Sequence, residues 1–245
     1  MTLRTPHHFI RSALLSSAAA CLAVSAHAAN VNPLLLTQPE FRLLSEDLGS
    51  VVSFKPMIPS ESMGLTGFDI GIAVSGTRLQ NRAVWEKAAA GGNVPSTLPV
   101  PALRVHKGLP FDIDIGVSLS KVPSSNIQIA GGELRWAFLP GGVATPAIAL
   151  RASYSALSGV DNLSLETTGL DLSISKGFLF LTPYAGVGTV RVKSKPDGFG
   201  LATETFTQGK VFAGVNMNFG LTNVVLEGDK TGQATSYGVK LGFRF

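Results

Sequence analysis

The sequence predicts an all-β fold, namely an antiparallel up-and-down transmembrane β-barrel of about ten strands with a short N-terminal helix. Apolar residues alternate with glycine or polar residues in many segments, which is the period of a β-strand. These segments are about ten residues long, the length that a tilted strand needs to cross a bilayer. Only 15% of the 245 residues are charged, and 27 are glycine. Low charge with 45% hydrophobic residues argues against a disordered chain.

Five segments show the alternation clearly and five show it weakly. In one clear segment, Phe111, Ile113 and Ile115 alternate with Asp112 and Asp114. A pair of glycines at 131–132 predicts a β-bulge in a weak segment. The clear segments are 65–77, 111–120, 148–154, 210–219 and 237–245, and the weak ones are 98–107, 126–138, 162–175, 179–192 and 221–228.

The connections between these strands are longer on average at one end of the expected barrel. Membrane barrels have short periplasmic turns and longer external loops, so we expect the end that includes loop 78–97 to face outward. Aromatic side chains at a membrane interface form a girdle. Such a ring is expected at the short-turn end, and a thinner ring of Tyr154, Phe206 and Tyr237 at the other. The short-turn ring consists of Phe111, Phe138, Phe178, Phe180, Phe219, Phe243 and Phe245.

The first 28 residues have the pattern of a cleaved secretory signal. Arg4 and Arg11 precede an uncharged stretch, 12–26, and an A-x-A motif ends at Ala28, so cleavage is expected between Ala28 and Ala29. An alternative is a lipoprotein signal with lipidation at Cys21, the only cysteine. We therefore divide the chain into the signal 1–28, an N-terminal segment 29–62 with a helix that could plug the barrel, and the barrel 63–245.

Two segments have helical rather than strand patterning. In 37–50, Thr37 and Glu40 form a possible capping box before an apolar face. This helix is expected at the periplasmic mouth or inside the barrel. The segment 80–90 lies in the longest external loop, where Trp85 either touches anionic lipid headgroups or packs the loop helix onto its neighbours.

Several functions are excluded or disfavoured by composition. The net charge is only +4 and the chain has no run of Lys and Arg, so we expect no nucleic-acid partner. No phosphate-binding or dinucleotide motif is present, and no cofactor is expected. A mature chain without Cys21 has no thiolate metal site, and no metal site is predicted. The carboxylates Asp161, Asp197 and Asp229 are expected in external loops, where they could collect divalent cations.

Twelve charged residues on the polar side of the strands are expected to face the lumen. Six acids against six bases predict a salt-bridged interior, because an unpaired charge in a narrow lumen is costly. The network either holds the barrel shut or lines a selective pore. Inward glycines such as Gly186 and Gly238 leave room that water or the helix can fill. The twelve are Asp69, Arg104, Asp112, Asp114, Glu133, Arg135, Arg151, Asp171, Lys210, Glu227, Lys240 and Arg244.

Catalysis has little support in the sequence, and we expect no enzyme. His106 is the only histidine after the signal, and a lone histidine is more often structural than catalytic. Asp112 and Asp114 share a strand face, so the pair could raise the pKa of one carboxyl group. A nearby arginine would instead keep both carboxylates ionised, which is the interpretation we favour.

The last strand, from Tyr237 to Phe245, resembles the closing strand of bacterial outer-membrane β-barrel proteins of the small porin-like kind. That family ends in phenylalanine, with apolar residues at every second position before it. The resemblance implies a Gram-negative outer membrane, contact with membrane lipid and lipopolysaccharide, and recognition by the barrel assembly machinery. The positions that match this assembly signal are Tyr237, Val239, Leu241, Phe243 and Phe245.

A secreted or periplasmic β-sandwich is the alternative fold, since it also alternates with its apolar face inward. For the barrel, the first function is a narrow porin-like channel or a structural barrel. The alternative is binding and uptake of a hydrophobic or small polar ligand, gated by the N-terminal helix. A surface enzyme is the least favoured function.

Overall fold

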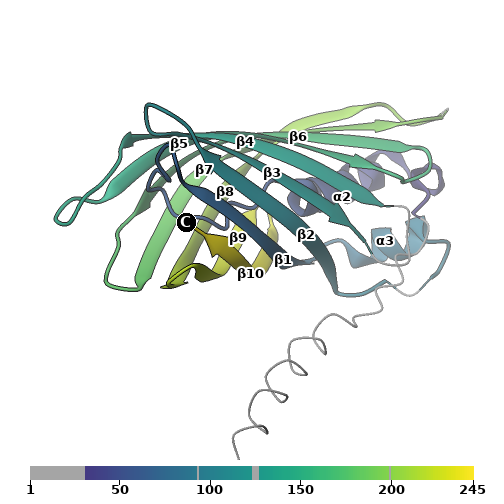
Figure 1. Ribbon diagram of the computed structural model, residues 1–245. Helices are drawn as coiled ribbons and strands as arrows, with labels where there is room; N and C mark the ends of the chain where they lie inside the picture. Colours follow the sequence, from purple (N-terminus) through teal and green to yellow (C-terminus); the bar gives the residue numbers. More distant parts are fainter. Residues whose placement is uncertain (1–30, 93, 123–126, 199) are drawn as a thin grey trace, which may run out of the picture.

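The structure is a computed structural model that describes residues 31–92, 94–122, 127–198 and 200–245. The predicted signal 1–28 lies outside these residues. Ten antiparallel strands follow one another around a closed barrel, and β1 pairs with β10 to close it (Figure 1). This confirms the predicted fold class. The strands are β1 (Phe68–Arg78), β2 (Thr97–Gly108), β3 (Ile113–Lys121), β4 (Gln128–Leu139), β5 (Ala147–Ser158), β6 (Leu163–Ser175), β7 (Leu181–Pro196), β8 (Glu204–Phe219), β9 (Thr222–Thr231) and β10 (Ala234–Arg244).

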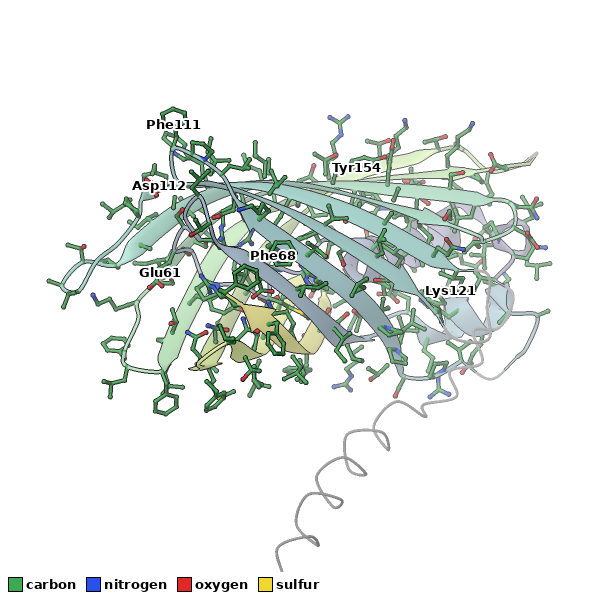
Figure 2. The ribbon with its side chains drawn as sticks, viewed as in Figure 1. Glu61, Phe68, Phe111, Asp112, Lys121 and Tyr154 are labelled. Atoms are coloured by element: carbon green, nitrogen blue, oxygen red, sulfur yellow. The ribbon has the colours of Figure 1, made fainter. Side chains whose placement is uncertain are left out.

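The alternation along the strands places apolar side chains on the outer wall over most of the barrel. The inward side chains are polar over much of the barrel and apolar around the N-terminal helix. On β1, for example, the Ile72 side chain is 57% exposed, whereas Asp69 and Thr77 are buried. This is the reverse of a soluble β-sandwich, whose apolar faces pack against each other. The outer wall carries exposed side chains along the whole barrel (Figure 2). The sandwich alternative is therefore wrong.

The two ends of the barrel differ in their connections. The short-turn end holds the turns 109–112, 140–146, 176–180 and 220–221, together with the C-terminus. The other end, called here the long-loop end, holds the connection 79–96. Phe111 and Asp112 occupy the tip of the first short turn with positive φ angles of 64° and 56°. This turn makes β3 begin at Ile113, later than the alternation predicted.

The aromatic ring predicted at the short-turn end is exposed on the outer surface, with Phe111 at 86%. Neighbouring rings pack together there, as in Phe68 and Phe245, whose centroids are 5.7 Å apart. At the other end Tyr154 and Tyr237 are exposed, but Phe206 is buried. The prediction for Phe206 is wrong because this residue shares its side of β8 with the inward-facing Lys210 and Phe212.

The predicted bulge at 131–132 is wrong in position. These two glycines pair regularly with Ser155 and Tyr154 of β5, and the register shift lies between Trp136 and Leu139. At Gly131 a Cβ atom would come within 3.0 Å of the Phe54 ring. A glycine is needed there because the N-terminal segment passes close to the wall, and not because the strand bulges.

The N-terminal helix α2 (Gln38–Val52) lies inside the barrel, at the long-loop end. It follows a short 3-10 turn, η1 (Pro33–Leu35). The external loop carries a second helix, α3 (Arg82–Ala88), beside α2 (Figure 1). After α2, residues 53–67 cross the lumen to the short-turn end, where β1 begins. Of the two predicted positions the inside is confirmed, and the short-turn mouth is wrong.

Candidate functional site: the filled lumen

Ten of the twelve charged residues predicted for the lumen are buried inside the barrel. Each comes from an inward-facing strand position, so the strand period places them on one surface. Arg244 lies at the end of β10 and is half-buried. The ten are Asp69, Arg104, Asp114, Glu133, Arg135, Arg151, Asp171, Lys210, Glu227 and Lys240.

Asp112 does not face the lumen. It is exposed at the tip of the β2–β3 turn, as Figure 2 shows. It therefore does not share a strand face with Asp114, and the pair of carboxylates considered for acid–base chemistry does not form. Asp114 instead forms a salt bridge with Arg135. The turn conformation decided this, because two residues with positive φ remove Asp112 from the strand.

Ion pairs connect the buried charges between neighbouring strands and, from Lys210 on β8 to Asp171 on β6, past the strand between them. Arg151 Nη1 and Lys210 Nζ both lie 3.7 Å from the same Asp171 oxygen. Burying such charges is costly unless each one is paired. Because the pairs share members, loss of one charge leaves another without its partner. The shortest pairs are Lys240–Asp69 at 2.6 Å, Arg135–Asp114 at 2.7 Å and Arg151–Glu133 at 2.8 Å.

His106 is part of this network. Its side chain is fully buried, and Nε2 lies 3.1 Å from Glu133 Oε1. The imidazole fills the space next to Gly116, where a Cβ atom would collide with it. The histidine therefore packs against the wall, and no substrate at the barrel surface can reach it.

The lumen cations also bind the backbone of the N-terminal segment. Arg104 Nη2 donates to the Lys55 carbonyl at 2.5 Å, and Lys210 Nζ donates to the Phe54 carbonyl at 2.6 Å. Arg135 donates to the Pro59 carbonyl. Segment 53–67 has no helix or strand, so its buried carbonyl groups need side-chain donors. The charges that the sequence predicted either to hold the barrel shut or to line a pore thus hold an extended chain in place.

The lumen acids bind the amide groups of the same segment. The Met57 N–H donates to Glu227 Oε2 at 2.6 Å, and the Met63 N–H donates to Asp114 Oδ1 at 3.0 Å. Both carboxylates sit on the wall, on β9 and β3. Acidic and basic side chains from different sides of the barrel therefore form hydrogen bonds with the backbone of this segment.

One buried ion pair was missed by the sequence analysis. Lys55 Nζ lies 2.9 Å from Asp229 Oδ1, and both side chains are buried. We expected Asp229 in an external loop, which is wrong, because β9 extends to Thr231. The period could have revealed it, since Asp229 lies two residues after Glu227 and shares its face. Lys55 itself stands alone as a charge between apolar residues and gave no such signal.

The space next to the inward glycines is filled by protein. The Phe212 ring occupies the position where Gly186 would carry a Cβ atom, and the Met57 methyl does the same at Gly238. Small cavities lie between the described residues, among them one of about 30 Å³ beside Lys55 and Arg104 and one of about 20 Å³ under α2. Each has room for only one or two waters.

The long-loop half of the lumen is filled by α2. Phe41 and Leu44 are fully buried against strand residues such as Val192. The helix is also held by hydrogen bonds, with Ser45 Oγ donating to Ser194 Oγ at 2.9 Å and Ser50 Oγ to the Thr231 carbonyl at 2.9 Å. Apolar packing therefore dominates in the long-loop half of the lumen, whereas ion pairs dominate in the short-turn half.

Asp47 joins α2 to the external loop. Its carboxylate accepts hydrogen bonds from the amides of Gln80 and Asn81 and from the Trp85 indole at 3.0 Å. Burial raises the pKa of Asp47, and the hydrogen bonds oppose that shift. Trp85 is buried, so it packs the loop helix onto α2 and does not reach lipid headgroups.

No group of three or more His, Cys, Asp or Glu side chains in the described part of the chain is arranged to hold a metal ion. Among the same residues, no helix combines the length and apolar character needed to span a bilayer.

Comparisons with known proteins give structural matches only. No family model matches the sequence, and no curated protein matches it. The N-terminal β-barrel domain of OprF from Pseudomonas aeruginosa is 16% identical, with a TM-score of 0.36, covering 72% of this chain and 97% of that one. The outer membrane protein Omp33 of Acinetobacter baumannii is 9% identical, with a TM-score of 0.34, covering 74% and 100%.

Neisserial surface protein A is 10% identical, with a TM-score of 0.30, covering 73% of this chain and 94% of that one. Scores of this size carry no conclusion about activity, so the fold assignment rests on the strand pairing itself. The pairing shows a closed ten-stranded up-and-down barrel, an architecture that these bacterial barrels resemble. The chain is therefore an up-and-down β-barrel with an apolar outer wall and a lumen filled by its own N-terminal segment.

Proposed function

We propose that this protein is a structural barrel of the Gram-negative outer membrane whose lumen is closed at rest. The observation that carries the proposal is the filling of the lumen by α2 and residues 53–62. A barrel of ten strands lies near the size at which side chains fill the interior. Here an extended chain occupies the interior as well, bound at Lys55, Met57 and Pro59. A narrow porin-like pore would require this segment to leave.

Conductance in planar bilayers tests the closed state. We expect no defined conductance steps from the intact protein or after deletion of residues 37–50 alone, because the chain that follows still fills the lumen. Defined steps are expected after deletion of residues 37–62. A Ser45→Cys/Ser194→Cys variant provides a reversible control, because the two Oγ atoms are 2.9 Å apart. Oxidation should keep this variant closed under a voltage that opens the reduced form. Steps of equal size from intact, oxidised and deleted proteins would show an open pore and overturn the proposal.

The placement in a membrane has its own test. Ile115 points outward from β3 and is 42% exposed. An Ile115→Arg variant should lose about 2–4 kcal/mol of folding free energy if this position lies near the centre of the bilayer. The measurement is equilibrium unfolding in urea from lipid vesicles, with Lys121→Gln beyond the apolar wall as the control. A neutral Ile115→Arg variant would contradict a lipid-facing wall.

Uptake of a hydrophobic ligand is the second candidate. It is favoured by the small cavity beneath α2, whose lining includes Leu48, Val51 and Trp85 and is apolar throughout. Movement of α2 would enlarge this cavity. A carrier should show saturable, solute-specific uptake in proteoliposomes that the oxidised disulfide variant abolishes, whereas a structural barrel shows none.

A further inference from the structure

A groove of about 190 Å³ lies on the outer wall of β5, β6 and β7, away from the lumen. Tyr154, Glu166, Lys193 and Lys195 line it. β6 and β7 are paired there, with Glu166 opposite Lys193. Tyr154 is visible on the outer wall in Figure 2. The groove is therefore open to whatever surrounds the barrel.

A stripe of positive charge borders the groove: Lys193 and Lys195 line it, and Arg191 lies one outward position beyond them on β7. Arg191, Lys193 and Lys195 occupy successive outward positions on β7, so they are spaced by about 7 Å along the strand. The two lysine side chains are 54% and 63% exposed. Within the described ranges, no carboxylate lies within 4.0 Å of Arg191, and Lys195 reaches Asp197 only at 4.0 Å. Two of the three cations are thus available to an external anion.

The single carboxylate in the groove is already engaged. Glu166 Oε1 lies 3.1 Å from Lys193 Nζ, and Oε2 accepts a hydrogen bond from the Tyr154 hydroxyl at 2.9 Å. Glu166 therefore fixes Lys193 and Tyr154 in position. It does not contact Arg191 or Lys195, and Lys195 has only the long, exposed pair with Asp197. Other outward cations near this end, such as Arg78 and Lys121, stand singly on their strands.

Toward the short-turn end the same wall becomes apolar. On β7 the outward position after Arg191 is the exposed Thr189, and Val187 follows it, while Leu170 and Leu172 are the outward positions opposite them on β6. A polar groove above an exposed apolar wall matches a molecule with an anionic headgroup and acyl chains. A free anion would use the cations but would leave the apolar wall without a function in binding.

We propose that this groove, together with Arg191 beside it on β7, binds a lipid that carries more than one phosphate group on its headgroup. Phosphate oxygens would contact Arg191 and Lys195, and the acyl chains would lie along Leu170, Leu172 and Val187. Arginine and lysine both bind phosphate through charge-assisted hydrogen bonds. The inference rests on the membrane placement of the proposed function but does not depend on whether the lumen is closed.

Native mass spectrometry of the protein in a neutral detergent tests the binding. The probes are lipid A with two phosphates, the same lipid after enzymatic dephosphorylation, and inorganic phosphate. The bisphosphorylated lipid should bind at least about tenfold more tightly than the dephosphorylated one, a difference of ~1.4 kcal/mol. Millimolar inorganic phosphate should not displace it. Equal affinity for both lipids, or displacement by phosphate alone, would overturn the proposal.

Matched variants locate the site. Arg191→Gln/Lys195→Gln should weaken binding by about tenfold, whereas Lys121→Gln/Lys230→Gln, with the same change in charge, should leave it unchanged. Equal weakening in both would mean attraction by net charge and would contradict a site on β7. All four side chains are exposed and point outward from strands, so we expect both variants to fold. The Ile115→Arg result reports membrane placement separately, so failure of the lipid site and failure of the proposed function can be distinguished.

Discussion

The two halves of the lumen are filled by different chemistry. At the long-loop end, α2 buries Phe41 and Leu44 in an apolar cluster that includes Leu165 and Val192. At the short-turn end, an extended chain is held by buried ion pairs and by charged side chains that bind its backbone. Apolar packing tolerates gradual loss, because each contact is small and non-directional. An ionic network fails in larger steps, since removing one member leaves another charge buried without a partner.

This difference suggests two kinds of closure within one barrel. The helix can separate from the wall mainly by exposing apolar surface. Its buried Asp47 carboxylate is bound to the external loop and not to the wall, so it can move together with that loop. The segment around Lys55 can leave only if several buried hydrogen bonds and ion pairs break together. We therefore expect the helix half to open first and the ionic half to keep the barrel closed. The predictions below test that order.

The largest effect is expected from Arg151→Met, which removes the cation between Glu133 and Asp171. Breaking a buried pair costs about 3–5 kcal/mol, because an uncompensated charge remains. The loss is measured as the change in the free energy of unfolding in urea. Unfolding is followed by the gel-mobility difference between folded and heated protein. Arg78→Met, at an exposed outward position, should change it by less than about 0.5 kcal/mol. Equal effects of the two variants would mean that the buried network contributes no more to the free energy of unfolding than an exposed arginine does.

Next in size is Leu44→Ala, which should weaken the docking of α2 by about 3 kcal/mol, within the range for buried leucines. Leu44 is fully buried, whereas Leu43 beside it is 38% exposed. Leu43→Ala is therefore the control and should have little effect. Hydrogen exchange should show lost protection in α2 and α3 only. Loss of protection along β1 and β10 as well would contradict the independence of the two halves.

A smaller effect is expected from Gly238→Ala. The new Cβ atom would collide with the Met57 methyl group, which belongs to the extended segment. The Met57 methyl is the end of a flexible side chain, so we expect a cost near the lower limit of overpacking, about 1 kcal/mol. In a Met57→Ala background the same change should cost less than about 0.5 kcal/mol, since the collision is gone. An undiminished cost in that background would show that the segment does not touch the wall at this point.

The smallest effect concerns the first turn of α2. Hydrogen bonds from Lys87 and Thr37 lower the pKa of Glu40 to about 2 from an ordinary 4.5. A lowered pKa means that this carboxylate stabilises the turn above about pH 4.5, and the contribution is lost as pH falls toward 2. Exchange of the first-turn amides should therefore accelerate over this range. Glu40→Gln should remove the dependence, and an unchanged profile in that variant would rule out Glu40 as its cause.

Much of the architecture could be read from the sequence because a strand has a period of two. Ile70, Ile72 and Val74 face outward as their alternation with Asp69 and Ala73 requires. The two-residue alternation gave a wrong prediction where a turn interrupts the strand. Asp112 continues the alternation in sequence, but its positive φ angle takes it out of β3. The predicted outward position of Phe206 was wrong for another reason. An aromatic residue near a strand end fits an outer girdle and an inner core equally well.

By itself the sequence determined the barrel, the face of each strand and ten of the charges inside it, because these follow from local alternation. Only the tertiary structure decided what fills the lumen. Segment 53–67 shows no regular alternation of apolar and polar residues. Its backbone N–H and carbonyl groups form hydrogen bonds with side chains from distant strands, such as Arg104 and Glu227. Contacts of that kind join residues far apart in the chain, and no local pattern records them.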